Sequence, residues 1–301
     1  MDIFNYDINL KTDKKIILCS TEKFRGIATF CLTNKKLEVW KYCDIEEKNN
    51  GQQRNISIEN AFEEVRNGNA ILLIALGKNV LYYLNKLETA GFEVVYSMRY
   101  LISMESLRKS DLYHECQSSI ETMEDMFFYE DAYMHKDKIY ISSIDATVTS
   151  RCSLKCKDCS NLMQYYSKPQ NYDVEEISKT LDIILQKIDM LNDLRILGGE
   201  PFMNNHFVKI IDKFKNHSKI RKISVYSNAT IFPDKVILES LKTSNVLLVF
   251  SDYGVLSRSL HQWEKWCTDN GVAYFVERVD WWQDCGKLQR HNYTEYELLD
   301  I

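Results

Sequence analysis

Short apolar runs alternate with amphipathic stretches along most of the chain, and this alternation predicts an α/β protein with parallel strands. The clearest strand is residues 70–76, where seven consecutive apolar residues show the pattern of a strand buried on both faces. An amphipathic helix is expected to follow, with its apolar positions between Val80 and Leu87, including Leu81, on one face. A second strand is expected at residues 93–96. A strand, a helix and a strand in this order predict a βαβ unit.

The alternation becomes regular from residue 139, where five strand–helix repeats are expected and the last is unfinished. The first helix is well supported, because Asp173 is a good N-cap, Glu176 follows three positions later and an apolar stripe continues to Leu191. The third helix is expected to begin at Pro233. The carboxyl ends of such strands converge in a βα barrel, so residues that follow them should share one site. The expected strands are 140–148, 194–197, 222–226, 246–250 and 272–276, and the helices lie near 174–191, 206–216, 233–242 and 256–270.

The stretch between these two regions carries many charges and few periodic signals, which indicates a solvated helical connection. The chain is therefore expected to divide into a small α/β domain at 1–102, this connection at 103–138 and a partial barrel at 139–301. The small domain lacks the G-x-G-x-x-G fingerprint of dinucleotide sites, and its first half, around residues 15–30, looks shortened.

Composition narrows the class of protein. Hydrophobic residues make up 45% of the 301 residues and charged residues 27%, as in an average folded globular protein. A formal net charge of −5 argues against a nucleic-acid partner, and no apolar stretch approaches the length of a membrane span. The acidic start does not read as a signal peptide, so a cytoplasmic location is expected.

Nine cysteines in a chain of this length without a secretion signal favour a reducing compartment over a disulfide framework. Six of them are scattered without ligand spacing and are interpreted as buried structural thiols. These six are Cys19, Cys31, Cys43, Cys116, Cys267 and Cys285.

The other three, Cys152, Cys156 and Cys159, form a C-x3-C-x2-C triplet just past the first strand of the expected barrel. Thiolates are the preferred ligands of iron–sulfur clusters, and three of them leave one iron of a four-iron cluster open. A zinc site lacking its fourth ligand and three unrelated buried thiols are the alternatives. The triplet resembles the cluster loop of the radical S-adenosylmethionine (SAM) superfamily. This resemblance implies that the cysteines hold a [4Fe–4S] cluster whose open iron chelates SAM.

A second motif, Gly198-Gly199-Glu200 followed by Pro201, comes directly after the second strand of the expected barrel. Two glycines let the backbone approach a ligand closely, and a glutamate can pair with an ammonium group. The motif resembles the glycine-glycine-glutamate motif of the same superfamily. By this resemblance, Gly198, Gly199 and Glu200 bind the methionine part of SAM, with Glu200 at its ammonium group.

Short polar residues follow the third and fourth expected strands, namely Ser227 with Asn228 and Ser251 with Asp252. The resemblance implies that they bind the ribose and carboxylate of SAM, although such residues also cap helices and form turns. The family usually has an aromatic residue just before the third cysteine, but this chain has Asp158 there. Tyr165 or Tyr166 is therefore a weaker candidate for the surface on which adenine stacks. Glu277 and Arg278, after the fifth strand, are further weak candidates.

The resemblance implies a partial (β/α) TIM-like barrel of the radical SAM type, preceded by a small Rossmann-like α/β domain. Such barrels normally have six strands, so either the sixth strand is absent or the chain is truncated, and Trp281 and Trp282 would then be partly exposed. The implied cofactors are a [4Fe–4S] cluster and SAM. The implied reaction is reductive cleavage of SAM, after which the 5′-deoxyadenosyl radical abstracts a hydrogen atom from a substrate.

The substrate is expected to be a small molecule or a peptide. A sugar or cell-envelope precursor is favoured, peptide modification is second and activation of a glycyl-radical partner is third, all by analogy with related enzymes. A one-electron donor such as flavodoxin or ferredoxin is the implied partner, and no nucleic-acid or membrane partner is expected. The competing hypothesis is a non-catalytic or truncated iron–sulfur binding protein.

Overall fold

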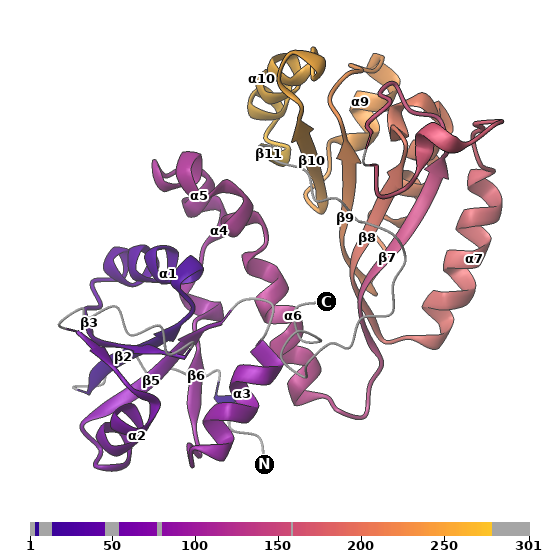
Figure 1. The fold of residues 1–301 in the computed structure, drawn as a ribbon. Coiled ribbons are helices and arrows are strands. Elements are labelled where there is room, and N and C mark those ends of the chain that lie inside the picture. Colours follow the sequence, from indigo (N-terminus) through magenta and orange to yellow (C-terminus); the bar gives the residue numbers. More distant parts are fainter. Residues whose placement is uncertain (1–3, 6–13, 46–53, 77–79, 158, 279–301) are drawn as a thin grey trace.

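Two parallel sheets organise the chain in a computed structural model that describes residues 4–5, 14–45, 54–76, 80–157 and 159–278 (Figure 1). Within these residues, the first sheet has six strands in the order β1-β6-β5-β2-β3-β4, and the second has five in the order β11-β10-β9-β8-β7. Every pair of neighbouring strands is parallel. The α/β class with parallel sheets that the apolar pattern predicts is therefore confirmed.

The first sheet is covered on both faces. Helix α1 packs with Ile16, Leu18 and Leu73 on one face, and α2 and α3 pack with Ile17, Leu72 and other residues on the opposite face. All positions of β5 are buried, as its unbroken apolar run predicts. The elements are β1 (Phe4–Asn5), β2 (Lys15–Ser20), α1 (Glu22–Asn34), β3 (Val39–Asp44), β4 (Asn55–Ile56), α2 (Ile58–Arg66), β5 (Ala70–Ala75), α3 (Val80–Thr89) and β6 (Val95–Ser97).

Two expectations for this half are wrong in detail. The region around residues 15–30 is not shortened, because it forms a complete strand β2 and the 13-residue helix α1. Leu81 is 39% exposed, and Tyr83 takes its place in the buried stripe of α3. Positions 80, 83, 84 and 87 follow the helical spacing of i, i+3, i+4 and i+7, which puts residue 81 on the outer face.

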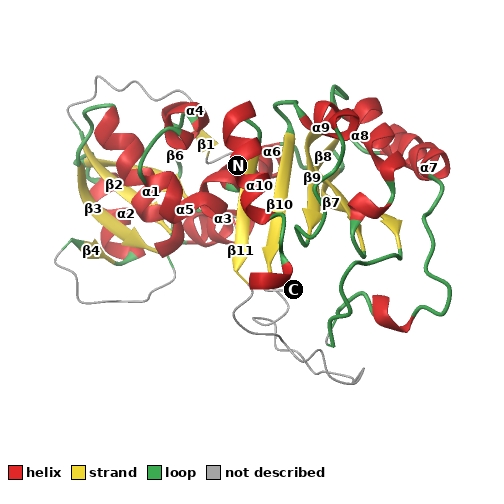
Figure 2. Cartoon of the chain, turned by 90° about the horizontal axis from the view of Figure 1, so that it is seen from above, coloured by secondary structure: helices red, strands yellow, loops and turns green. Residues whose placement is uncertain are grey.

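Three helices connect the sheets, namely α4 (Met104–Arg108), α5 (Leu112–Glu121) and α6 (Met123–Met134). The expected solvated connection is wrong for α6, which lies between the two sheets in both Figure 1 and Figure 2. Met126, Phe128 and Glu130 on this helix are almost completely buried. A helix enclosed on several sides has no polar stripe, so its sequence lacks the amphipathic period from which buried helices are usually recognised.

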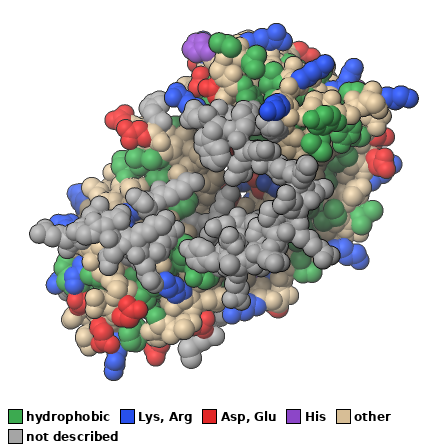
Figure 3. Space-filling view, in the orientation of Figure 1, with side chains coloured by type: hydrophobic (Ala, Val, Ile, Leu, Met, Phe, Trp, Pro, Cys, Tyr) green, Lys and Arg blue, Asp and Glu red, His purple; other side chains and the backbone are tan. Residues whose placement is uncertain are grey.

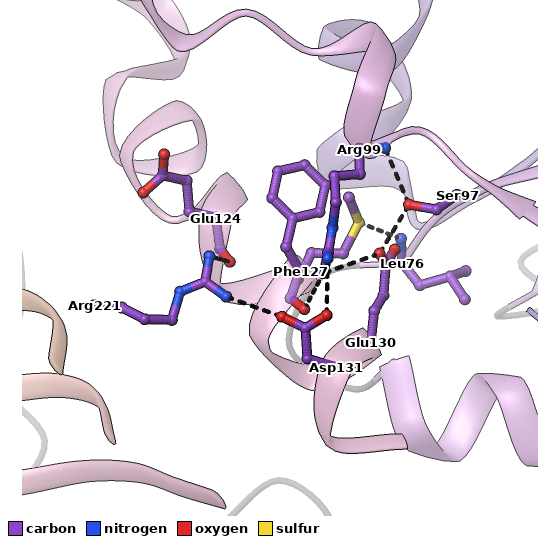
Figure 4. Close-up of polar contacts among 9 residues, drawn as sticks. Leu76, Ser97, Arg99, Glu124, Phe127, Glu130, Asp131 and Arg221 are labelled. Atoms are coloured by element: carbon purple, nitrogen blue, oxygen red, sulfur yellow. Dashed lines mark hydrogen bonds and ion pairs between the residues drawn. The ribbon is translucent and has the colours of Figure 1, made fainter. Parts of the chain in front are cut away.

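Polar contacts of α6 reach both sheets (Figure 4). Nη1 of Arg99 donates to Oδ1 of Asp131 at 2.8 Å, and Arg221 at the start of β9 lies 3.6 Å from Oδ2 of the same carboxylate. Ser97 at the end of β6 donates to Oε2 of Glu130 at 2.8 Å. Burial raises the pKa of Glu130 to about 8, although this hydrogen bond and Arg99 oppose the shift.

Helix α6 also contacts the second sheet through Asp125. Its Oδ1 accepts hydrogen bonds from Nδ2 of Asn192 at 2.9 Å and from Nζ of Lys222 at 2.5 Å, and all three side chains are largely buried. Because a buried charge left without its partner costs several kcal/mol, removing either member of this ion pair should destabilise the docking of α6 on the second sheet.

Helix α5 contacts the outer edge of β11 (Ala273–Arg278), the last strand that the structure describes. The hydroxyl of Tyr113 donates to the carbonyl of Tyr274 at 2.9 Å, and the amide of Val276 donates to Oε1 of Gln117 at 3.3 Å. Residues four apart on one helix thus satisfy backbone groups two apart on the strand. A sixth strand would pair at this edge. Residues 279–301, which include Trp281 and Trp282, lie outside the described residues.

The second sheet is covered on its outer face by α7, α8, α9 and α10, with Trp263 completely buried among Phe202, Phe232 and Phe250. The remaining elements are β7 (Tyr140–Thr149), α7 (Val174–Lys187), β8 (Met190–Gly198), α8 (Val208–Phe214), β9 (Ile220–Ser227), α9 (Lys235–Leu241), β10 (Val246–Asp252) and α10 (Leu260–Asn270).

The expected elements of this half are all present, with shifted ends. Leu191 belongs to β8 and not to the preceding helix, because α7 ends at Lys187. Helix α9 begins after Asp234, whose carboxylate accepts hydrogen bonds from the amides of Val236 and Ile237, so the side-chain cap and not Pro233 sets its start.

No helix among the described residues is both long and apolar enough to cross a membrane. On the face shown in Figure 3, lysine and arginine side chains are interspersed with aspartate and glutamate over both halves of the molecule.

Candidate cofactor site

The three cysteines of the triplet lie in the loop that follows β7 and line one hollow of about 260 Å³. The carboxyl ends of β8, β9 and β10 complete its wall, with Gly198, Ser227 and Ser251 among the lining residues. The three cysteines are half-buried: part of each residue is open to the hollow, and the rest is covered by the protein. Residues far apart in sequence are thus brought together at one end of the sheet, as the barrel geometry predicts.

The thiols of this loop influence one another. Burial raises the pKa of Cys152, and Glu200, Cys156 and Cys159 raise it further, against an opposing hydrogen bond from the amide of Leu154. Burial and Cys159 also raise the pKa of Cys156. Cys152 and Cys156 therefore hold their protons until a cation such as iron replaces them.

As the described side chains stand, no three of His, Cys, Asp or Glu are arranged to hold one metal ion. A four-iron cluster makes a different demand, because each thiolate binds a separate iron and the ligands stand further apart. Three accessible thiols around one hollow, with N–H groups directed at the sulfur of Cys152, fit such a group.

The two glycines of the second motif lie directly against the start of the cysteine loop. The amide of Gly199 donates to the carbonyl of Thr149 at 3.0 Å, and the amide of Glu200 donates to the carbonyl of Arg151 at 2.8 Å. A Cβ atom on Gly199 would lie 2.2 Å from the carbonyl oxygen of Arg151. Glycine is therefore required here by the neighbouring backbone of the cysteine loop, and not only by the approach of a ligand.

The side chain of Glu200 does not line the hollow. It is completely buried, and its carboxylate accepts hydrogen bonds from Oγ of Ser227 at 2.9 Å, from the amide of Asn228 at 2.9 Å and from the amide of Phe202 at 3.2 Å. Burial raises its pKa to about 7, while these three hydrogen bonds lower it. These contacts join the ends of β8 and β9, and they do not test the expected pairing of the carboxylate with an ammonium group.

The four polar residues after the third and fourth strands have different surroundings. Ser227, Asn228 and Ser251 line the hollow. The carboxylate of Asp252 instead accepts a hydrogen bond from the amide of Gly254 at 2.8 Å and closes the turn after β10. Asp252 is thus a turn residue in this structure, which is the alternative that its residue type already allowed.

The sequence motifs did not reveal three large side chains in the wall of the hollow, Met163, Tyr226 and Tyr253. Tyr226 stands next to Ser227 and Tyr253 two positions after Ser251, so their closeness in sequence to residues already singled out could have indicated them. Tyr165 and Tyr166, proposed as the stacking surface, are 73% and 46% exposed and do not line the hollow.

The remaining candidates stand elsewhere or are not described. Glu277 and Arg278 are exposed at the end of β11 and are not in the wall of the hollow. Cys19, Cys31, Cys43 and Cys267 are buried, as structural thiols are expected to be, and Cys116 is half-buried. Asp158 and Cys285 lie outside the described residues.

Comparison with protein families gives a match between residues 146–251 and the model of the radical SAM superfamily. These residues are similar to the radical SAM superfamily. The match runs from β7 into β10, so it includes the three cysteines, the glycine pair and Ser251. The superfamily uses a [4Fe–4S] cluster and SAM, and its members are generally enzymes. The cofactors implied by the sequence motifs are therefore those of the radical SAM domain.

The individual relatives are distant. The radical SAM cyclopropyl synthase TigE of Paramaledivibacter caminithermalis is 28% identical over 127 residues, which are 37% of this chain and 27% of that protein. The GTP 3′,8-cyclase of Clostridium acetobutylicum is 30% identical over 94 residues, 31% of this chain and 29% of that protein. The matched part thus spans less than a third of the length of either curated relative.

Among solved structures, SuiB of Streptococcus suis bound to S-adenosylmethionine is 14% identical, with a TM-score of 0.35 over 71% of this chain and 58% of that chain.

Proposed function

We propose that this chain is a radical SAM enzyme in which Cys152, Cys156 and Cys159 hold the cluster and the adjoining hollow receives SAM. The observation that carries the proposal is that the three thiols and the glycine pair line a single hollow at the carboxyl end of the strands. When bound, the cluster and SAM supply one-electron cleavage of SAM and abstraction of a hydrogen atom from a substrate.

The chain's own residues orient the cofactors and exclude water. Gly198, Gly199 and Ser251 line the hollow, and we propose that their polar groups bind the methionine and ribose parts of SAM. Tyr226 and Tyr253 offer apolar ring surface beside these polar groups. Burial raises the pKa of Tyr226 to about 12 and also raises that of Tyr253, so both hydroxyls stay protonated at neutral pH.

Glu200 has a supporting role in this proposal. Its carboxylate accepts hydrogen bonds from Ser227 and from the amide of Asn228, so it fixes the end of β9 relative to the glycine pair. It therefore holds the wall of the hollow in place rather than touching SAM. Asp252 acts in the same indirect way, through the turn after β10.

The substrate proposal keeps the order drawn from the sequence, with a sugar or cell-envelope precursor first, a peptide second and activation of a glycyl-radical partner third. The two relatives described above, by their names, make a cyclopropyl group and cyclise GTP, so they do not favour one substrate class. A flavodoxin or ferredoxin is proposed as the electron donor. We propose the division into residues 1–102, 103–138 and 139–301 as the domain organisation.

Anaerobic reconstitution with iron and sulfide, followed by electron paramagnetic resonance (EPR) of the reduced protein with and without SAM, tests the proposal. We expect a reduced-cluster signal that changes shape when SAM is added, because SAM binds the open iron. The signal should be absent from the Cys156→Ala variant and unaffected in Cys116→Ala, a matched thiol away from the hollow. A cluster that forms but does not respond to SAM would favour the non-catalytic iron–sulfur protein instead.

A further inference from the structure

A side-chain amide lies against the sulfur atom of one of the three cysteines. Asn228 follows β9 and is 7% exposed, and its Nδ2 lies 3.7 Å from Sγ of Cys152. The backbone amide of Leu154 lies 3.5 Å from the same sulfur. Two N–H groups, one of them from the segment that follows β9, are therefore directed at the first cysteine of the triplet.

The orientation of this amide follows from its other partners. The backbone N–H of Thr230 donates to Oδ1 of Asn228 at 3.0 Å, and the Thr230 hydroxyl donates to the same oxygen at 2.7 Å. A backbone N–H can only donate, so the amide oxygen must face Thr230 and the NH₂ group must face the cysteine loop. The other Nδ2 hydrogen is directed at Oγ of Ser153, at 3.1 Å.

The backbone of Asn228 is held as firmly as its side chain. Its amide donates to Oε2 of Glu200 at 2.9 Å, and its carbonyl accepts a hydrogen bond from Oγ of Ser257 at 2.9 Å. The next residue, Ala229, has a φ of 54°, a left-handed conformation that an alanine adopts only when its surroundings impose it. Every polar atom of Asn228 thus has at least one partner within the chain, which fixes both its backbone and its side chain.

We propose that Asn228 is a positioning residue that raises the reduction potential of the cluster by donating a hydrogen bond to the sulfur of Cys152. The proposal rests on the proposed function, because it requires the cluster to bind at the three cysteines. A reduced cluster carries one more negative charge than an oxidised one, so a donor on a ligand sulfur stabilises the reduced form more. This role differs from the contact with SAM that the sequence resemblance implies for Asn228, which stays a prediction.

The first test is a redox titration of the reconstituted protein without SAM. Asn228→Leu keeps a similar volume but has no donor, so the ratio of reduced to oxidised cluster at a fixed potential should fall about threefold to tenfold. That change corresponds to a midpoint roughly 30–60 mV more negative for one electron. Asn161→Leu is the matched control, because it makes the same substitution at the other asparagine that lines the hollow. Its midpoint should stay that of the wild type. A full complement of iron in Asn228→Leu with an unchanged midpoint would overturn the proposal.

A second test uses the wild-type protein, so it stays decisive even if Asn228→Leu fails to assemble the cluster. With asparagine labelled with ¹⁵N only at its side-chain amide, pulsed EPR of the reduced cluster should show a ¹⁵N coupling. The coupling should persist in Asn161→Ala, since Asn161 is the other asparagine of the hollow. Loss of the coupling in Asn161→Ala, or its absence from the wild type, would overturn the proposal. Failure of the wild type to bind any cluster would instead refute the proposed function.

Discussion

Replacing Gly199 by alanine should dislodge the cysteine loop, because the added methyl group would occupy space that the loop backbone already fills. The new Cβ would lie 2.2 Å from the carbonyl oxygen of Arg151 and 2.7 Å from Cβ of Cys152. Real Cβ atoms stay beyond 3.0 Å from other heavy atoms, so the Arg151 peptide must move by roughly 1 Å in a close-packed region.

The free-energy cost has two parts. Overpacking of this kind destabilises a protein by about 1–3 kcal/mol. The movement also breaks the hydrogen bond from the amide of Glu200 to the carbonyl of Arg151, now 2.8 Å long, and a buried polar group left without a partner costs a further 1–3 kcal/mol or so. We therefore expect Gly199→Ala to lower the free energy of unfolding by about 2–6 kcal/mol and to reduce the iron bound after reconstitution.

Gly26→Ala is the matched control. Gly26 lies within α1, and a Cβ added there would meet no atom within 4 Å. Alanine in a helix is favoured over glycine by roughly 0.5–1 kcal/mol, so this variant should be slightly more stable than the wild type and bind normal iron. Urea unfolding followed by circular dichroism, with iron analysis of the same samples, measures both effects. If Gly199→Ala matches Gly26→Ala in stability and iron content, the Arg151 backbone does not cross Gly199 and the geometry of the site is wrong.

Three further changes test other parts of the structure. Cys159→Ala should abolish cluster assembly, measured as iron and sulfide content, because no other thiol lines the described hollow to replace it. Glu130→Gln should flatten the pH dependence of the free energy of unfolding. Burial raises the pKa of Glu130 from 4.5 to about 8. The favourable contribution of Glu130 to stability is therefore complete below about pH 4.5 and is lost as the pH rises through 8. At pH 8.5 the variant should be the more stable protein by an amount on the order of 2–4 kcal/mol in urea unfolding, and equal slopes for both proteins would contradict this. Asp125→Ala leaves the buried ammonium group of Lys222 without its partner and should cost about 3–5 kcal/mol in the same assay, whereas Asp269→Ala, at an exposed ion pair, should change stability by less than about 1 kcal/mol.

The succession of strands and helices could be predicted from the sequence because buried strands and amphipathic helices leave a periodic apolar pattern. The run at residues 70–76 and the stripe from Val174 to Leu185 are examples. Helix α6 could not be predicted as a buried helix, because contacts from several sides erase its polar stripe. Its buried carboxylates, Asp125 and Glu130, read as surface charges until their partners on the two sheets are known.

The positions of the candidate site could also be predicted, because motif spacing and barrel geometry place residues that follow successive strands at one end. What individual side chains do there could not. Glu200 is directed away from the hollow because its partners, Ser227 and Asn228, come from the next strand. Glycine is needed at position 199 because the backbone of Arg151, about 50 residues earlier in the sequence, passes directly over it. A contact between segments so far apart cannot be predicted from the local sequence.

Quantification of 5′-deoxyadenosine tests the central claim most directly. The anaerobically reconstituted protein is incubated with SAM and dithionite, beside a variant in which Cys152, Cys156 and Cys159 are all alanine. We expect 5′-deoxyadenosine and methionine in equal amounts from the wild-type protein, formed slowly even without substrate, and none from the variant. A wild-type protein that carries a complete, reducible cluster and still yields no 5′-deoxyadenosine would contradict the assignment of radical SAM enzyme activity to this chain.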